Sequence, residues 1–141
     1  MLGSPALSPA WSAMSDRHPE RLAAGNRLRS SREHTAVRSG ATAYRGKLCL
    51  LLALAVPGEP SKIGIIASRR GVGNAVERNR ARRRLREILR RRWPRIPATG
   101  FWLEFVASTA VLAASHQALA SEVEHLLASA GALLPLAELE R

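Results

Sequence analysis

One segment of the sequence carries more positive charge than an isolated helix tolerates well. Between Arg78 and Arg92, nine of the fifteen residues are arginine, and Glu87 is the one acidic residue among them. Like charges three or four residues apart destabilise a helix. The segment therefore needs an apolar face that anchors it to a core, and its charge is typical of a surface that meets a polyanion.

The same segment has the apolar repeat of an amphipathic helix. At about 100° per residue, four apolar side chains gather on one face: Ala81, Leu85, Ile88 and Leu89. The opposite face carries Asn79, Arg80, Arg83, Arg86 and Arg90, with Arg84 and Arg91 on a flank. Asn74 and Glu77 have the spacing of a capping box, which predicts a helix start near residue 75. The sequence WPRIP is expected to end this helix.

The charge of the chain is concentrated in this region. Residues 61–95 carry 13 basic and 2 acidic side chains, a net charge of +11, whereas residues 1–60 carry +4 and residues 96–141 carry −4. A focused basic patch is typical of nucleic-acid binding. Three alternatives stay open: a solvated face that keeps the protein soluble, a non-catalytic module such as a ribosomal protein or a DNA-binding helix, and a membrane-surface helix. The last is disfavoured because the narrow apolar face is needed by the core.

The flanking sequence predicts a small α+β domain. Ser30 and Glu33 open a helix over residues 28–39, with Gly40 expected at its C′ position. The sequence YRGKLCLLLALAV reads as one buried strand closed by the turn PGEP. Further strands are expected over Lys62–Arg69 and Phe101–Ser108, and a last helix over 115–130 with Leu119, Val123, Leu126 and Leu127 as its core face. The predicted order is α-β-β-α-β-α in a single domain.

Length and composition indicate the extent of the domain and the compartment of the protein. We expect a disordered N-terminal tail over residues 1–25, one domain over 26–131 and a C-terminal tail over 132–141. Cys49 is the single cysteine, which excludes an internal disulfide and suits a reducing compartment. The longest apolar run, 48–56, is too short to span a bilayer, and the N-terminus has no secretory signal pattern. The sequence predicts a cytoplasmic protein.

The sequence offers no set of residues for catalysis by the protein itself. Its four histidines, at 18, 34, 116 and 125, lack metal-ligand spacing. Gly71 and Gly73 lack the spacing and the lysine of a phosphate-binding loop, and no G-x-S-x-G sequence is present. We therefore predict neither catalytic nor metal-ligating residues. If the chain is part of an enzyme, another molecule performs the chemistry.

The stretch GNAVERNRARRRLRE resembles the signature of the bacterial ribonuclease P protein subunit family. The matching residues are Gly73, Asn74, Ala75, Val76, Arg78, Asn79, Arg80, Arg82, Arg83, Arg86 and Glu87. The surroundings also agree over about residues 26–130, including a second strand that ends in Ser68, Arg69 and Arg70. The resemblance implies a ribosomal protein S5 domain 2-like α+β fold with a left-handed β-α-β crossover. Pattern alone does not predict that hand, because roughly 98% of such crossovers are right-handed.

The resemblance also implies a function. In this family a catalytic RNA, with Mg²⁺ held by the RNA and substrate, hydrolyses the bond that releases the 5′ leader from precursor tRNA. The protein subunit binds the catalytic RNA and the leader. The expected partners are therefore the ribonuclease P catalytic RNA and precursor tRNA, with no DNA and no membrane.

Residue roles follow from the matching positions. The residues expected to bind the RNA subunit are Arg78, Asn79, Arg80, Arg82, Arg83, Arg86 and Arg90. The residues expected to bind the leader, in a cleft between the sheet and the first helix, are His34, Arg38, Arg69 and Arg70. The sequence departs from the family in two places. Gly71 adds a residue after the basic pair, and His34 and Arg38 stand where the family usually has aromatic side chains that stack on the leader.

Overall fold

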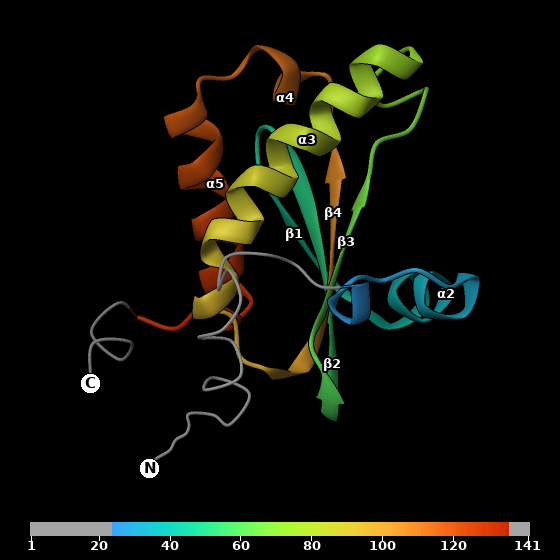
Figure 1. Ribbon diagram of the computed structural model, residues 1–141, viewed down its shortest axis with the longest axis vertical. Coiled ribbons are helices and arrows are strands. Elements are labelled where there is room, and N and C mark those ends of the chain that lie inside the picture. Colours follow the sequence, from blue (N-terminus) through green and yellow to red (C-terminus); the bar gives the residue numbers. More distant parts are fainter. Residues whose placement is uncertain (1–23, 136–141) are drawn as a thin grey trace.

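The computed structural model describes residues 24–135, and Figure 1 shows its arrangement. The elements follow in the order η1 (Ala24–Asn26), α2 (Ser31–Gly40), β1 (Thr42–Arg45), β2 (Cys49–Pro60), β3 (Lys62–Ile66), α3 (Ala75–Arg92), η2 (Trp93–Arg95), β4 (Thr99–Ala107), α4 (Ala110–Ala113) and α5 (His116–Ser129). The expected disordered tail over 1–25 lies outside the described residues except for its last two. Residues 136–141 of the expected C-terminal tail also lie outside them.

The strands form one sheet in the order β1-β2-β4-β3. Strands β1, β2 and β4 pair antiparallel, whereas β3 lies parallel to β4 at the edge. Helix α3 connects β3 to β4, so the chain makes a β-α-β crossover between neighbouring parallel strands. The crossover is the one that the family resemblance implies, and its left hand stays a prediction.

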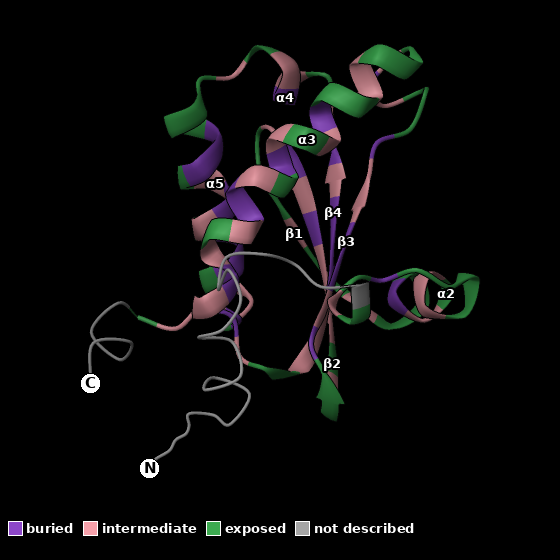
Figure 2. Ribbon diagram, viewed as in Figure 1, coloured by how far each residue is buried: buried purple, intermediate pink, exposed green. Residues whose placement is uncertain are grey.

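The helices cover the two faces of the sheet unequally. Figure 1 shows α3 and α5 on one side of the sheet and α2 on the other. Because side chains alternate along a strand, Leu103 and Phe105 of β4 face α3 and α5, while Trp102 and Glu104 face α2. Leu103 and Phe105 are fully buried in the core cluster, and Figure 2 shows the buried residues concentrated where α3 and α5 meet the strands.

The arginine helix and its caps are as predicted. Helix α3 spans Ala75–Arg92, and all four residues of its predicted apolar face are fully buried. Asn74 Oδ1 accepts a hydrogen bond from the Glu77 backbone N–H at 2.9 Å, and Glu77 Oε1 accepts one from the Asn74 N–H at 2.9 Å. The capping box of α2 is also confirmed, as is the buried face of α5.

The prediction of one strand through residues 44–56 is wrong. The chain forms a hairpin, with a turn between Arg45 of β1 and Cys49 of β2. Glu122 of α5 explains the turn, because its carboxylate accepts hydrogen bonds from the backbone N–H groups of Lys47, Leu48 and Cys49, each at 2.8 Å. Gly46 faces the same carboxylate, where a Cβ would collide with it.

Two smaller expectations also need correction. Gly40 is the last residue of α2 rather than its C′ residue, and Ala41 caps the helix in an extended conformation. A Cβ on Gly40 would lie 3.2 Å from Leu54 Cδ1, so the glycine allows the helix end to approach β2 closely. The sequence PGEP does not close β2, which continues to Pro60 with a register shift after Val56.

The end of the described chain packs against the domain. Ala132 is fully buried, and the Leu134 N–H donates to the Arg95 carbonyl at 2.7 Å. Arg95 Nε in turn donates to the Leu134 carbonyl at 3.1 Å. These residues of the expected C-terminal tail therefore contact η2.

We predict that Glu122→Ala lowers the free energy of unfolding by about 2–3 kcal/mol. The variant leaves three backbone N–H groups of the hairpin turn without their charged acceptor, and hydrogen bonds to charged groups contribute about 1.5–3 kcal/mol each without adding fully. Urea unfolding measures the change, with Ser121→Ala, an exposed neighbour on α5, as the control. A loss below about 0.5 kcal/mol contradicts the role of Glu122.

Candidate nucleic-acid interface

Several arginines of α3 fasten the helix to the rest of the domain. Arg84 donates to the carbonyls of Val111, Leu112 and Ala114, at 2.5, 3.2 and 2.6 Å. These carbonyls lie in and directly after the short helix α4, so Arg84 satisfies backbone acceptors that a helix end leaves unpaired. Arg84 therefore holds α3 and α4 together.

The C-terminal end of α3 is fixed by ion pairs. Arg92 lies 2.8 Å from Glu124 of α5, and Arg95 of η2 lies 3.8 Å from the same carboxylate. Arg90 and Arg91 pair with Glu87 one turn earlier, at 2.9 and 3.1 Å. Hydrogen bonds from Arg90 and then Arg91 lower the pKa of Glu87. Arg90, one of the predicted RNA-binding residues, thus has a protein partner as well as an exposed portion.

The N-terminal half of α3 organises the loop before it. Arg78 Nη1 donates to the Gly73 carbonyl at 3.0 Å, and Arg82 Nη2 donates to the Ala67 carbonyl at the end of β3 at 3.2 Å. Arg82 Nη1 also donates to Asn79 Oδ1 at 3.1 Å. Three of the predicted RNA-binding residues, Arg78, Asn79 and Arg82, therefore also brace the start of the helix.

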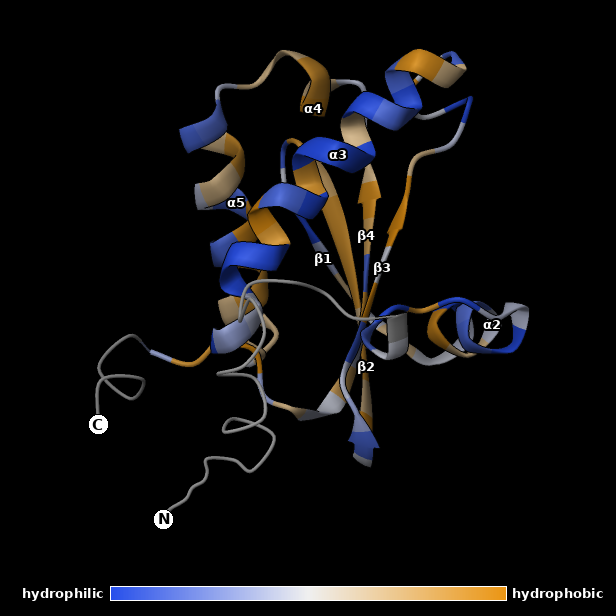
Figure 3. Cartoon of the chain, in the orientation of Figure 1, coloured by the Kyte–Doolittle hydropathy of each residue, from blue (hydrophilic) through white to orange (hydrophobic). Residues whose placement is uncertain are grey.

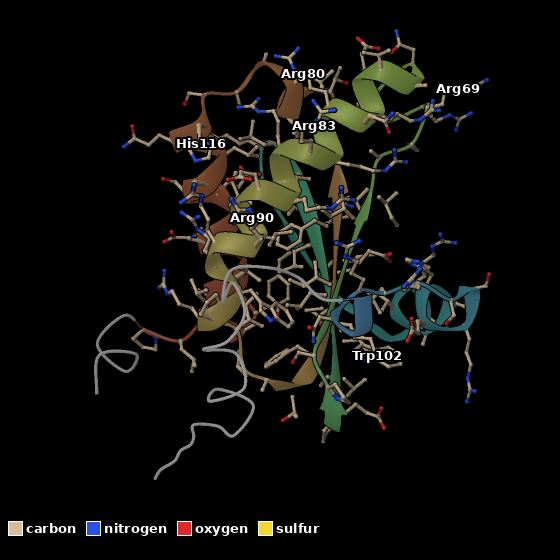
Figure 4. The ribbon with its side chains drawn as sticks, in the orientation of Figure 1. Arg69, Arg80, Arg83, Arg90, Trp102 and His116 are labelled. Atoms are coloured by element: carbon tan, nitrogen blue, oxygen red, sulfur yellow. The ribbon has the colours of Figure 1, made fainter. Side chains whose placement is uncertain are left out.

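The remaining predicted residues of α3 form an exposed stripe. Arg80, Arg83 and Arg86 are exposed, and within residues 24–135 none of the three makes a hydrogen bond or ion pair. Figure 4 shows Arg80, Arg83 and Arg90 along one side of α3, and Figure 3 shows hydrophilic residues along the solvent side of the helix above the hydrophobic strands. At 1.5 Å per residue the stripe from Arg80 to Arg86 extends for about 9 Å. Desolvation, then the charges of Arg27 and Arg82, lower the pKa of Arg86.

Val76 extends this stripe toward the N-terminus of α3. Its relative exposure is 76%, the one large hydrophobic residue among those described that is exposed. It lies four residues before Arg80 and so on the same side of the helix. The stripe therefore begins with an apolar contact surface.

The four predicted leader residues lie in two separate groups. Arg69 and Arg70 are exposed in the loop after β3, where the extra residue Gly71 is accommodated in a turn and its N–H donates to Ser68 Oγ at 2.9 Å. His34 and Arg38 lie on α2, which contacts the opposite end of β3 through Glu33 and Lys62. No hydrogen bond or ion pair joins the two groups within the described part of the chain. Arg38 is exposed there.

His34 points to the sheet and pairs with a residue that the sequence analysis missed. Its Nδ1 lies within hydrogen-bond distance of Glu104 Oε2, and the Glu104 side chain is fully buried whereas that of His34 is 27% exposed. Glu104 Oε1 and the nearby Trp102 Nε1 are buried and have no hydrogen-bond partner among residues 24–135. The sequence signal for this pair is a carboxylate in the otherwise apolar stretch FWLEFVA, together with a histidine on the helix that faces this strand.

An ion pair joins α2 to the sheet beside the contact of His34 with Glu104. Lys62 Nζ lies 2.5 Å from Glu33 Oε2 and 5.6 Å from the centre of the Trp102 ring. The hydrogen bond from Lys62, followed by that from the Arg29 N–H, lowers the pKa of Glu33 from its ordinary 4.5 to about 2. Polar side chains at two successive positions, Glu33 and His34, therefore hold α2 against the sheet.

The described residues contain no group of three or more histidine, cysteine or acidic side chains that could hold a metal ion. None of the described helices is long and apolar enough to cross a membrane. Cys49 is buried against Glu122, and burial, followed by the Glu122 charge, raises the pKa of its thiol to about 12.

These features define a small single-domain α+β protein with an arginine stripe on its longest helix. The family model described as Ribonuclease P matches residues 22–131. The chain therefore belongs to the ribonuclease P protein family.

Relatives named ribonuclease P protein component share parts of the sequence. The protein of Symbiobacterium thermophilum is 42% identical over 76 residues, covering 54% of this chain and 64% of its own length. That of Pseudarthrobacter chlorophenolicus is 52% identical over 67 residues, covering 47% and 48%, so in both cases less than two thirds of the relative is matched. That of a Synechococcus strain is 36% identical over 117 residues, covering 80% and 87%.

Solved structures share the fold at low sequence identity. The ribonuclease P protein of Staphylococcus aureus superposes with a TM-score of 0.67 at 18% identity, covering 77% of this chain and 97% of that chain. The protein of Thermotoga maritima gives a TM-score of 0.62 at 24% identity, covering 72% and 94%. The expected single-domain α+β fold is thereby confirmed.

We predict that Glu33→Gln destabilises the domain at neutral pH, and that the difference from the wild type shrinks as the pH falls from about 4.5 to about 2. The folded-state pKa of Glu33 lies below its ordinary value, so its contribution is present above pH 4.5 and is lost as the carboxylate becomes protonated. Glutamine keeps the capping-box acceptor. Urea unfolding across this pH range measures the difference. Glu59→Gln, at an exposed position, is the control, and an equal pH dependence in both variants contradicts the assignment.

Proposed function

We propose that the chain is the protein subunit of a bacterial ribonuclease P. It binds the catalytic RNA and the 5′ leader of precursor tRNA, and so assists the endonucleolytic removal of the leader that produces mature 5′ ends. Hydrolysis takes place on the RNA, with Mg²⁺ held by the RNA and substrate, in the cytoplasm. The observation that carries the proposal is the exposed stripe of Arg80, Arg83 and Arg86. It lies within the residues that the family model matches, in the stretch that resembles the family signature.

The way α3 is fixed supports a role in RNA binding. Arg84 and Arg92 tie the helix to α4 and α5, so the exposed guanidinium groups are presented from a rigid element. A guanidinium group binds phosphate through two parallel hydrogen bonds, and each phosphate contact releases counterions from the RNA. The helix therefore supplies position and charge to a partner that has its own catalytic centre.

The α2 side of the sheet supports a role in binding a single strand. Leu50 and Leu52 of β2, Val106 of β4 and Ile66 of β3 face this side by their register and are only half-buried. Apolar surface beside exposed cations suits the bases and phosphates of a single strand. Arg38 lies on the helix that borders this surface. We place the leader there, and Arg69 and Arg70, which lie after the other end of β3, remain proposed leader contacts farther along the strand.

Reconstitution with a bacterial ribonuclease P RNA tests the proposal. At low Mg²⁺ concentration we expect the protein to accelerate cleavage of precursor tRNA by the RNA, because it supplies positive charge and holds the leader. The protein without RNA is expected to leave the substrate intact. No acceleration, together with stable binding of an unrelated RNA, favours a non-catalytic module such as a ribosomal protein. Cleavage by rigorously RNA-free protein contradicts the placement of the chemistry on the RNA.

We predict that the double variant Arg80→Ala/Arg83→Ala binds the catalytic RNA more weakly and with a shallower salt dependence. Each lost phosphate contact lowers the slope of log affinity against log salt by roughly 0.7–0.9. The free energy of unfolding should change little, because both side chains are exposed and make no hydrogen bond or ion pair within residues 24–135. Filter binding over a range of salt concentrations and urea unfolding measure the two quantities.

Arg84→Ala is the matched control on the same helix. It removes one positive charge but also three hydrogen bonds to backbone carbonyls, so we expect a clear loss of stability and a smaller change in the salt slope. An unchanged salt slope in the Arg80→Ala/Arg83→Ala variant is the outcome that excludes the stripe from RNA binding.

A further inference from the structure

Glu104 is a carboxylate buried between β4 and α2, a placement that lowers the stability of the fold. Its side chain is fully buried, and from Phe101 to Ala107 every other side chain of the strand is apolar or aromatic. A buried carboxylate destabilises a fold by several kcal/mol unless a partner compensates. An apolar side chain at this position would pack without that cost, so the carboxylate needs another explanation.

The surroundings leave room for the carboxylate and give it one partner. Gly64 of β3 is registered against Glu104, and a Cβ at residue 64 would lie 3.2 Å from Glu104 Oε2. His34 of α2 reaches the same oxygen with its Nδ1. The other oxygen, Oε1, has no partner. The site therefore fixes a histidine ring at one nitrogen.

The contact of Nδ1 with Glu104 determines which ring nitrogen of His34 can bind another molecule. A buried carboxylate on Nδ1 sets the ring orientation and tautomer, and leaves Nε2 as the nitrogen that can meet another molecule. The His34 side chain keeps 27% of its surface exposed, on the side of the sheet where Arg38 and the half-buried strand residues lie. With Nδ1–H donating to Glu104, Nε2 accepts a hydrogen bond from a ribose hydroxyl when the ring is neutral and donates one to a phosphate oxygen when the ring is protonated. Stacking on a base instead uses the flat face of a ring.

We propose that Glu104 is a positioning residue that holds His34 by Nδ1, so that the Nε2 edge of the ring hydrogen-bonds to the sugar–phosphate backbone of the single-stranded leader. This inference rests on the proposed function, since it names how that leader is held. It replaces base stacking at position 34 with a contact that does not depend on the identity or presence of the base.

The variant His34→Asn keeps the link to Glu104 and removes the contact that Nε2 makes with the leader, so it tests that contact by itself. The asparagine amide places a donor close to where Nδ1 lies, so the link to Glu104 and the fold are kept, but nothing replaces Nε2. In the holoenzyme we expect the ratio of affinities for precursor and mature tRNA to fall by about 3- to 10-fold, as for one lost net hydrogen bond. Thr35→Ala, an exposed neighbour on α2, is the control. An unchanged ratio in a folded His34→Asn protein overturns the contact.

Glu104→Leu tests the positioning role, and His34→Phe/Glu104→Leu supplies the stacking alternative. With Glu104→Leu we expect the ratio to fall although His34 is present, and with the double variant we expect it to recover. Precursors with abasic leader nucleotides then distinguish the two modes: the wild type should keep its preference, and the double variant should lose it. Full preference in Glu104→Leu, or equal sensitivity of both proteins to abasic leaders, overturns the inference.

Failure of the inference is distinct from failure of the proposed function. If the wild type does not accelerate cleavage by the catalytic RNA, the proposed function itself fails. If it does accelerate cleavage while all three variants discriminate the leader as the wild type does, the His34 contact and its positioning by Glu104 are both wrong and the proposed function stands. If Glu104→Leu does not fold, His34→Asn still decides the contact.

Discussion

The structure depends on the burial of one face of α3. Ala81, Leu85, Ile88 and Leu89 are fully buried against the sheet and α5, and each large apolar side chain contributes roughly 1.5–3 kcal/mol when buried. A like-charged pair on a helix costs only about 0.2–0.5 kcal/mol. Burial therefore outweighs the repulsion among the arginines, and the domain can carry a dense positive surface without a bound partner.

The arginines that the helix bears are divided between two tasks. Arg84 and Arg92 face neighbouring elements and bind backbone carbonyls or Glu124, whereas Arg80 and Arg83 face solvent. The same residue type serves both tasks because a guanidinium group donates to carbonyl, carboxylate and phosphate oxygens alike. Counting arginines in the sequence thus overstates the charge that is available to RNA.

Local features of the fold could be predicted from the sequence, and long-range ones could not. The capping boxes of α2 and α3 and the apolar face of α3 each depend on residues within a turn or two of one another. The β1–β2 turn depends on Glu122, 75 residues beyond Lys47, so no window around the turn reveals it. The residues of the candidate site divide in the same way, into a local group and a long-range pair. The exposed stripe of α3 was predicted from helical periodicity, whereas the pairing of His34 with Glu104 joins residues 70 positions apart.

Site-directed crosslinking to the catalytic RNA tests the central claim, that the solvent side of α3 is the RNA-binding surface. Cys49 is buried and its thiol has a pKa of about 12, so a photoreactive maleimide reagent can be directed to one introduced cysteine. Val76→Cys places it at the start of the stripe, and Ser121→Cys places it at an exposed position on α5. The account predicts that irradiation crosslinks the Val76→Cys protein to the RNA and leaves the Ser121→Cys protein free. Equal crosslinking from both positions, or crosslinking from α5 alone, would contradict it.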